Sequence, residues 1–168
     1  MSEQIPPPPP AILAALTQAA ESQSVPLELL TGVAWVESRF NPGALSPRGA
    51  RGLMQLSQAV LTAYGNPDPY DPMRSAAIAA AELARLQKRF GGWHRATAAY
   101  VWGEGNVLRH PDPSQWPQAV LDYTARVRSA ARYAPLPFPG EVIHVALAEG
   151  YRGPSPFSTS LRSGAGDA

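Results

Sequence analysis

The sequence predicts a mainly α-helical, single-domain fold, and three observations lead to this prediction. The chain has 168 residues, a length that suits one domain with one buried core. Hydrophobic residues make up 45% of it and charged residues only 16%, which favours a packed globule over a disordered chain. Apolar residues recur at helical spacing along most of the sequence, whereas the only strand-like stretch, 141–147, is ambiguous.

Two helices are expected near the start, after a proline-rich arm. Residues 1–10 end in five consecutive prolines, which predict a stiff polyproline II spacer that stays outside the core. Helical spacing of apolar residues predicts a first helix over 11–22. Ser24 followed by Pro26 resembles a helix start with a capping side chain, so a second helix is expected from 27 to about 39.

Loops and helices alternate along the rest of the predicted domain. Residues 41–51 contain two prolines and two glycines, which predicts a loop long enough to bind a ligand. A short helical turn is expected around Met54, and Gly103-Glu104-Gly105 is interpreted as a loop. The remaining helices are expected from a Ser57 cap to Tyr64, from Asp71-Pro72 to Phe90, over 93–102, and over 114–133.

The C-terminal part of the chain, 135–168, is rich in proline and glycine and predicts an irregular arm. The folded domain is therefore expected to span 11–134. Composition also excludes several classes of protein. The chain has no cysteine, so disulfide frameworks and thiol nucleophiles are excluded. Its net charge of +1 comes without a basic stripe, and no nucleic-acid partner is expected.

Transport and metal signals are also missing from the sequence. No apolar run approaches the roughly 20 residues that span a bilayer, so no membrane span is expected. The first ten residues lack the basic and apolar regions of a secretory signal. His94, His110 and His144 stand far apart without metal-ligand spacing, so surface or structural roles are expected for them and no metal or cofactor is predicted.

Glu37 is the acidic residue with the most unusual setting. A solvated surface glutamate is the ordinary interpretation, but a carboxylate at a helix C-terminus opposes the helix dipole. Trp35 and Val36 precede it, and burial against apolar groups would raise its pKa, as an acid that protonates a glycosidic oxygen requires. A partner carboxylate is not evident, because Asp71 is explained as a helix cap and Asp68 as a turn residue.

A family resemblance extends this reading of Glu37. Residues 37–56, ESRFNPGALSPRGARGLMQL, are similar to the signature of the soluble lytic transglycosylases, the SLT domain of the lysozyme-like superfamily. Three weaker blocks follow in the family's order: Asp71-Pro72, AYVWGEGNV at 99–107, and YTARV at 123–127. The resemblance covers roughly 11–133 and implies a lysozyme-like single domain with a substrate cleft.

The resemblance also implies roles for individual residues. Glu37 would be the catalytic acid and then the base, and Ser46 would hydrogen-bond near its carboxyl or near the N-acetyl group of the substrate. Met54 and Gln55 would line the cleft, and Tyr100 and Tyr123 would face the acid. One departure is notable: Val101 replaces the family's asparagine, and Trp102 replaces a small residue and is expected to stack on a sugar ring.

The implied reaction is cleavage of the MurNAc–GlcNAc β-1,4 bond of peptidoglycan with formation of 1,6-anhydro-MurNAc ends. The substrate's N-acetyl group and C6 hydroxyl would then replace a second carboxylate and water. Two alternatives stay open: a hydrolase similar to goose-type lysozyme, and a non-catalytic wall-binding module.

The expected setting is the bacterial cell wall, on its periplasmic or extracellular side. Peptidoglycan strands are the expected partner, and a monomer is expected. Because no signal peptide is evident, delivery by a phage particle or a secretion apparatus is the expected route.

Overall fold

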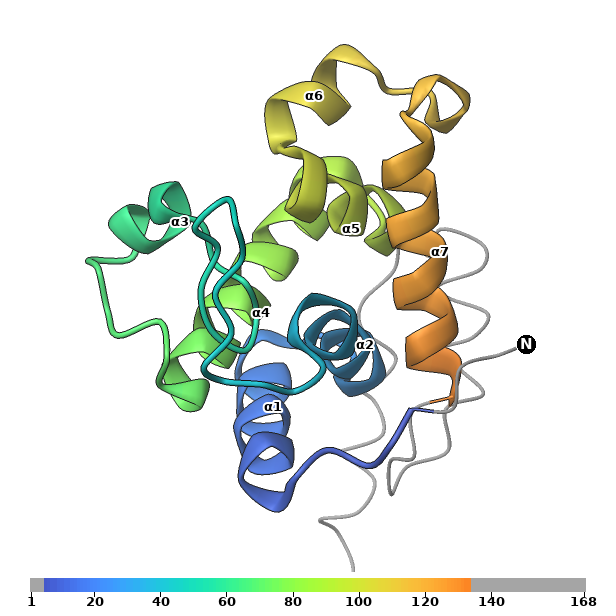
Figure 1. Ribbon diagram of the computed structural model, residues 1–168. Helices are drawn as coiled ribbons and strands as arrows, with labels where there is room; N and C mark the ends of the chain where they lie inside the picture. Colours follow the sequence, from blue (N-terminus) through green and yellow to red (C-terminus); the bar gives the residue numbers. More distant parts are fainter. Residues whose placement is uncertain (1–4, 134–168) are drawn as a thin grey trace, which may run out of the picture.

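A computed structural model describes residues 5–133, and within them the fold consists of helices and loops (Figure 1). The α-helices are α1 (Pro10–Gln23), α2 (Leu27–Ser38), α3 (Gln58–Ala63), α4 (Pro72–Phe90), α5 (Trp93–Trp102), α6 (Glu104–Arg109) and α7 (Gln118–Tyr133), with a short 3₁₀ helix at Pro113–Gln115. The predicted mainly α class is therefore confirmed.

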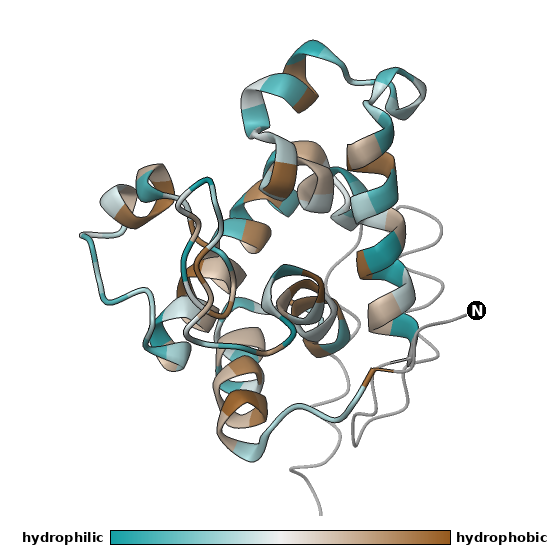
Figure 2. Cartoon of the chain, in the orientation of Figure 1, coloured by the Kyte–Doolittle hydropathy of each residue, from teal (hydrophilic) through white to brown (hydrophobic). Residues whose placement is uncertain are grey.

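Helix α2 lies at the centre of the fold. Every residue from 27 to 34 is buried, so the helix is enclosed on all sides, as expected for a helix without a polar face. Figure 1 shows α2 nearly end-on with α1, α4 and α7 around it, and Figure 2 shows its apolar colouring. Gly32 permits the close approach of α7, because a Cβ there would lie 2.8 Å from the Val127 carbonyl oxygen. The far end of this buried helix carries Glu37.

Several predicted helix boundaries are confirmed. Helices α4 and α5 cover the predicted residues. The Ser57 hydroxyl caps α3 by accepting a hydrogen bond from Val60 N, and the Asp71 carboxylate caps α4 by accepting from Met73 N and Arg74 N. These starts were predictable because capping needs one local side chain at a fixed offset from the first turn.

Two boundary predictions are wrong, and both errors have a local cause. Ser24 does not start α2: it ends α1 in a left-handed conformation (φ 54°), and Pro26 is the N-cap of α2 without a side-chain bond. The predicted helix over 114–133 is divided, and α7 begins only at Gln118. Pro117 explains the division, because it holds the preceding residue, Trp116, in an extended conformation (ψ 145°).

The predicted loop at Gly103-Glu104-Gly105 is also wrong. Only Gly103 breaks the helix, with φ 96°, and α6 begins at Glu104. Asn106 donates from Nδ2 to the Trp102 carbonyl oxygen at 2.6 Å and so connects α6 to the end of α5. The second glycine made this segment resemble a loop, although one glycine suffices for the change of direction.

The proline-rich start is partly integrated into the domain. Ile5 is 6% exposed and belongs to the hydrophobic core, and Pro8 is buried. The prediction that Pro6–Pro10 cannot join a core is therefore wrong for Pro8, and Ile5 just before these prolines also reaches the interior. The predicted arm at 135–168 and the ambiguous segment at 141–147 lie outside the described residues. No helix in the described part of the chain is long and apolar enough to cross a bilayer.

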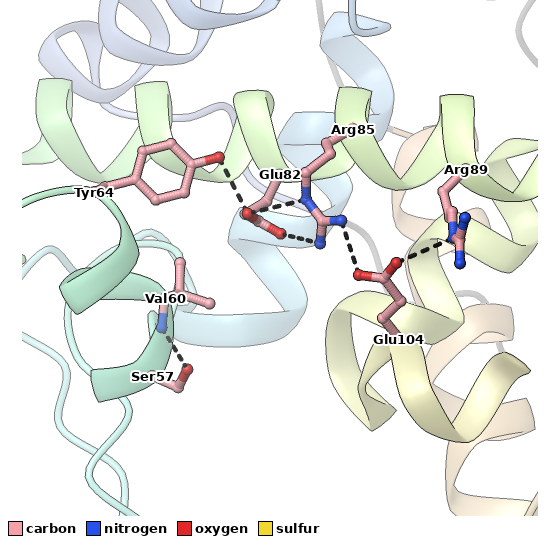
Figure 3. Close-up of polar contacts among 7 residues, drawn as sticks. All are labelled: Ser57, Val60, Tyr64, Glu82, Arg85, Arg89 and Glu104. Carbon is pink, nitrogen blue, oxygen red and sulfur yellow. Dashed lines mark hydrogen bonds and ion pairs between the residues drawn. The ribbon is translucent and has the colours of Figure 1, made fainter.

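A row of ionic contacts connects α3, α4 and α6 along one side of the molecule (Figure 3). The Tyr64 hydroxyl donates to Glu82 at 3.1 Å, and Glu82 pairs with Arg85 at 3.0 Å. Arg85 also contacts Glu104 at 2.8 Å, and Arg89 contacts the other oxygen of Glu104 at 3.3 Å. The first residue of α6 is thus held by two guanidinium groups of α4.

Candidate active site

Glu37 lies where the central helix reaches the surface. It is partly exposed, one residue before the end of α2. Arg39 and Phe40 follow in left-handed conformations (φ 56° and 62°), which turn the chain away sharply behind the carboxyl. Phe40 is only 5% exposed and packs on Trp35 with ring centroids 5.2 Å apart, which holds this turn in place. The helix end that carries Glu37 is therefore fixed by core packing.

Tyr123 from α7 contacts the carboxyl directly. Its hydroxyl donates a hydrogen bond of 2.5 Å to Glu37 Oε1, across 86 residues of sequence. Tyr123 is 8% exposed, so this bond forms in a largely buried setting. The close packing of α2 on α7 at Gly32 brings the two side chains together. The expectation that Tyr123 faces Glu37 agrees with this contact.

The protonation of Glu37 is set by three influences. Burial raises its pKa from the ordinary 4.5 to about 7, and the Tyr123 hydrogen bond and the positive charge of Arg126 act in the opposite direction. A carboxyl with this pKa is present in both protonation states near neutral pH. It can therefore donate a proton in one step and accept one in the next.

Tyr100 reaches the same region from α5. Its hydroxyl donates to the Met54 carbonyl oxygen at 2.8 Å. The negative charge of Glu37 contributes to holding the pKa of Tyr100 well above its usual value, after burial as the main cause, so Tyr100 is a neutral hydrogen-bond donor near the acid. Tyr100 therefore contacts the turn at 52–55 and lies close enough to Glu37 for its own pKa to respond to the Glu37 charge.

The loop at 41–56 carries the other predicted residues. Leu45 pairs with Arg51, and Arg51 pairs with Leu56, as isolated antiparallel bridges. Ser46 closes the tip of this loop, because its hydroxyl accepts from Ala50 N at 3.1 Å and its N–H donates to the Ala50 carbonyl oxygen at 2.9 Å. The Ser46 hydroxyl thus makes its hydrogen bond within the loop in this structure.

Met54 and Gln55 follow in the same loop with different roles. Met54 has 0% exposure, and its backbone groups rather than its side chain make the polar contacts of this turn. Gln55 adopts φ 51°, and its side-chain amide donates to the carbonyl oxygens of Gly52 and Ala44 at 3.1 and 3.3 Å. Both residues stabilise the shape of the loop beside Glu37.

Val101 and Trp102 occupy the end of α5. Val101 is 44% exposed and offers an apolar surface where the family pattern has an amide. The Trp102 ring is partly buried and stacks on His110, with centroids 5.6 Å apart and planes 25° apart. One face of the indole is therefore occupied by a residue of this chain.

The acids near the loop are committed to other contacts. Asp68 accepts from Tyr70 N at 3.0 Å, and Asp71 caps α4, as predicted. Glu82 and Glu104 are paired with arginines. The groups that act on the pKa of Glu37 are a tyrosine and an arginine rather than a second carboxylate. Glu37 is therefore equipped to act as a single acid/base.

Two residues of this site were not identified from the sequence. Ser38 donates from its hydroxyl to Leu53 O at 2.7 Å and so fastens the end of α2 to the loop. Arg126 lies one helical turn after Tyr123 and acts on the same carboxyl. The i, i+3 spacing of Tyr123 and Arg126 on one helix could have indicated the second residue.

Comparison with known proteins identifies the family of this chain from its sequence. Residues 14–119 match the sequence profile described as the transglycosylase SLT domain. The chain therefore belongs to the SLT domain family.

Among its relatives, "Peptidoglycan transglycosylase gp16" of Escherichia phage T7 is 38% identical over 98 residues, which cover 54% of this chain and 7% of the phage protein. "Membrane-bound lytic murein transglycosylase F" of Yersinia pestis (strain Pestoides F) is 39% identical over 89 residues, covering 48% of this chain and 18% of that protein. The similarity thus spans only a small part of these larger proteins.

Solved structures show the same fold. An inactive mutant of the lytic transglycosylase Slt from Pseudomonas aeruginosa matches with a TM-score of 0.62 at 22% identity, covering 84% of this chain and 25% of that one. The 70 kDa soluble lytic transglycosylase Slt70 from Escherichia coli matches with a TM-score of 0.51 at 21% identity, covering 92% and 24%. These matches confirm the lysozyme-like fold expected from the sequence.

Proposed function

We propose that this chain is a peptidoglycan lytic transglycosylase with Glu37 as its single acid/base. The observation that carries the proposal is the setting of Glu37: a largely buried carboxyl with a pKa of about 7 and a hydrogen bond from Tyr123. Membership of the SLT family and relatives named as transglycosylases support the substrate class.

In the proposed reaction, protonated Glu37 donates its proton to the glycosidic oxygen as the bond from this oxygen to C1 of MurNAc breaks. The substrate's N-acetyl oxygen stabilises the positive charge at C1. The Glu37 carboxylate then removes the proton of the C6 hydroxyl as O6 bonds to C1, which forms the 1,6-anhydro ring and restores the acid. No water is consumed, and no second carboxylate is needed.

The other predicted site residues have supporting roles in this proposal. Tyr123 orients the Glu37 carboxyl, and Tyr100 helps to hold the loop beside it. The substrate cleft would run past Gln55 and Ser46, with the buried Met54 beneath its surface. Val101 and the exposed part of Trp102 would contact the glycan from α5.

The site of action would be the cell wall on its periplasmic or extracellular side. The similarity to a phage protein supports delivery by a phage particle, with a secretion apparatus as the other route. The protein would act on peptidoglycan strands as a monomer.

Mass spectrometry of digested peptidoglycan tests the proposed reaction. The purified protein is incubated with purified peptidoglycan sacculi, and the masses of the released muropeptides are measured. A transglycosylase releases products one water lighter than the reducing-end products of a hydrolase. Reducing-end products would instead identify a goose-type-lysozyme-like hydrolase, and sedimentation with the sacculi without release would identify a wall-binding module.

A further inference from the structure

The turn at 52–55 is fastened by side chains from three different helices. Ser38 of α2 donates to the Leu53 carbonyl oxygen at 2.7 Å, and Tyr100 of α5 donates to the Met54 carbonyl oxygen at 2.8 Å. Ser75 of α4 accepts from Met54 N at 3.2 Å. Two successive carbonyl groups and the N–H between them are therefore bound by residues 15 to 46 positions away in sequence.

Ser75 is the most deeply buried of the three residues that fasten this turn. It has 0% exposure, and its bond to Met54 N is buried. The turn approaches this part of the chain closely: a Cβ on Gly52 would lie 1.9 Å from Pro69 O and 3.5 Å from the Ser75 hydroxyl. Without the Ser75 hydroxyl the Met54 N–H would be buried without a hydrogen-bond acceptor, because water has little room to replace it. A buried donor without an acceptor lowers the stability of the fold.

The turn lies against the end of α2 that carries Glu37. Ser38, the neighbour of Glu37, bonds both Leu53 O and its own helix at Ala34 O. Leu53 and Met54 are both 0% exposed and add apolar bulk at this point. The polar groups that act on Glu37 come from α7, namely Tyr123 and Arg126, and Tyr100 of α5 lies close enough for its pKa to be raised by the Glu37 charge.

We propose that Ser75, together with Ser38 and Tyr100, is a positioning residue that holds the turn at 52–55 against α2 and keeps water away from Glu37. Ser75 acts through the Met54 peptide and does not touch the carboxyl. Its position in the first turn of α4, after the Asp71 cap, fixes the hydroxyl on a rigid element. The inference rests on the proposed function only where catalysis is measured.

Ser75→Ala removes the acceptor and is the direct test. The matched control is Thr97→Val, which removes another buried hydroxyl, one that bonds only within α5 (Thr97 Oγ1 to Trp93 O, 2.8 Å). The Glu37 pKa is measured without substrate by ¹³C NMR titration of the labelled carboxyl. In Ser75→Ala it should fall from about 7 toward its ordinary value, because the loosened turn lets water reach the carboxyl. In Thr97→Val it should stay unchanged.

Kinetics on sacculi supply the second measurement. Ser75→Ala should lower kcat by about tenfold with little change in KM, because a displaced acid affects the transition state more than binding. Thr97→Val should lose thermal stability but keep the wild-type kcat. Should Ser75→Ala fail to fold by circular dichroism, Ser38→Ala frees the same turn at Leu53 O, and the same changes are expected.

The inference is overturned if a folded Ser75→Ala or Ser38→Ala variant keeps the wild-type Glu37 pKa and kcat while only its melting temperature falls. The titration separates this inference from the proposed function. If the wild-type protein releases no muropeptides but the Glu37 pKa falls in Ser75→Ala, the positioning role stands and the proposed reaction is wrong.

Discussion

At the scale of single residues, the proton on Glu37 determines how activity depends on pH. A pKa of about 7 keeps the acid protonated below neutral pH, so kcat/KM should be level there and fall as pH rises above 7. Tyr123→Phe removes a donor that stabilises the carboxylate. The pKa of Glu37 should then rise further, which moves the falling limb to higher pH, and the plateau should drop roughly tenfold as the carboxyl loses its orientation.

Arg126→Gln is the control for this prediction. Arg126 acts on Glu37 by its positive charge, whereas Tyr123 acts by a hydrogen bond, so this substitution removes the charge and leaves the hydrogen bond in place. It should shift the limb in the same direction by less, and added salt should reduce the difference from wild type. A limb that moves to lower pH in Tyr123→Phe would contradict the assignment of Tyr123 as a donor to the carboxylate.

Gly52 and Gly49 give a second prediction at this scale, because they share a left-handed backbone but not the same surroundings. Their φ angles are 78° and 82°, yet a Cβ on Gly52 would meet Pro69 O at 1.9 Å, whereas one on Gly49 meets nothing within 4 Å. Gly52→Ala should destabilise the protein by on the order of 3 kcal/mol. Gly49→Ala should cost about 1 kcal/mol. Urea unfolding measures both, and equal losses would refute close packing at Gly52.

At the scale of secondary-structure elements, the ionic row of Figure 3 attaches α6 to α4. Arg85 contacts two carboxylates but is 48% exposed, so solvent screening limits its contribution. Arg85→Met should reduce the free energy of unfolding by about 1 kcal/mol or less, and the loss should shrink at high salt.

Arg74→Met is the control for this ionic row, since Arg74 of α4 makes an exposed pair at 3.4 Å with Asp71, the N-cap of the same helix. Its loss should be smaller, below about 0.5 kcal/mol. If Arg85→Met costs no more than Arg74→Met in thermal or urea unfolding, the row adds nothing beyond ordinary surface pairs.

Elements with local signals could be predicted from the sequence, and elements set by packing could not. The Ser57 and Asp71 caps and the glycines after Phe90 defined α3, α4 and α5 because each signal acts within a few residues. Helix α6 was missed because it has only six residues, with one glycine as its N-cap and another inside it, and so carries little periodicity. Its position depends on Asn106 and Glu104 contacts that only the folded chain supplies.

The same distinction applies to the candidate site. The family resemblance pointed to Glu37 as the candidate acid and to Tyr123, from a separate block, as a residue facing it, and these two side chains are in contact across 86 residues. Ser38 lies within the sequence block around Glu37 but was given no role, and Ser75 gave no signal, because a serine hydroxyl has no recognisable spacing until its backbone partner is known. The raised pKa of Glu37 likewise depends on burial, which sequence suggested but only packing produces.

At the scale of the whole molecule, Ile5 extends the folded domain beyond the predicted start at residue 11. Because this side chain is 6% exposed in the core, Ile5→Ala should cost about 2 kcal/mol of unfolding free energy. Pro7→Ala, at an exposed position of the same segment, should change stability by less than about 0.5 kcal/mol. Equal, negligible effects in calorimetry would show that residues 5–10 act only as a spacer.

The central helix α2 connects the buried core to the proposed catalytic residue, Glu37. Helix α2 is buried from 27 to 34, is packed closely by α7 at Gly32, and ends in a partly exposed acid. This arrangement produces a carboxyl that is rigid and largely shielded from water. It also explains how Glu37 could act without a second acid, since the neighbours that tune it are Tyr123 and Arg126.

Glu37→Gln gives the most direct test of this account, because it keeps the size of the side chain and removes the titratable proton. The variant and the wild-type protein are incubated with peptidoglycan sacculi, and released muropeptides and sedimented protein are measured together. The account predicts that wild type releases anhydro-muropeptides, whereas Glu37→Gln binds the sacculi equally well and releases at least about a thousandfold less. Wild-type turnover by the Glu37→Gln variant would contradict the assignment of Glu37 as the single acid/base.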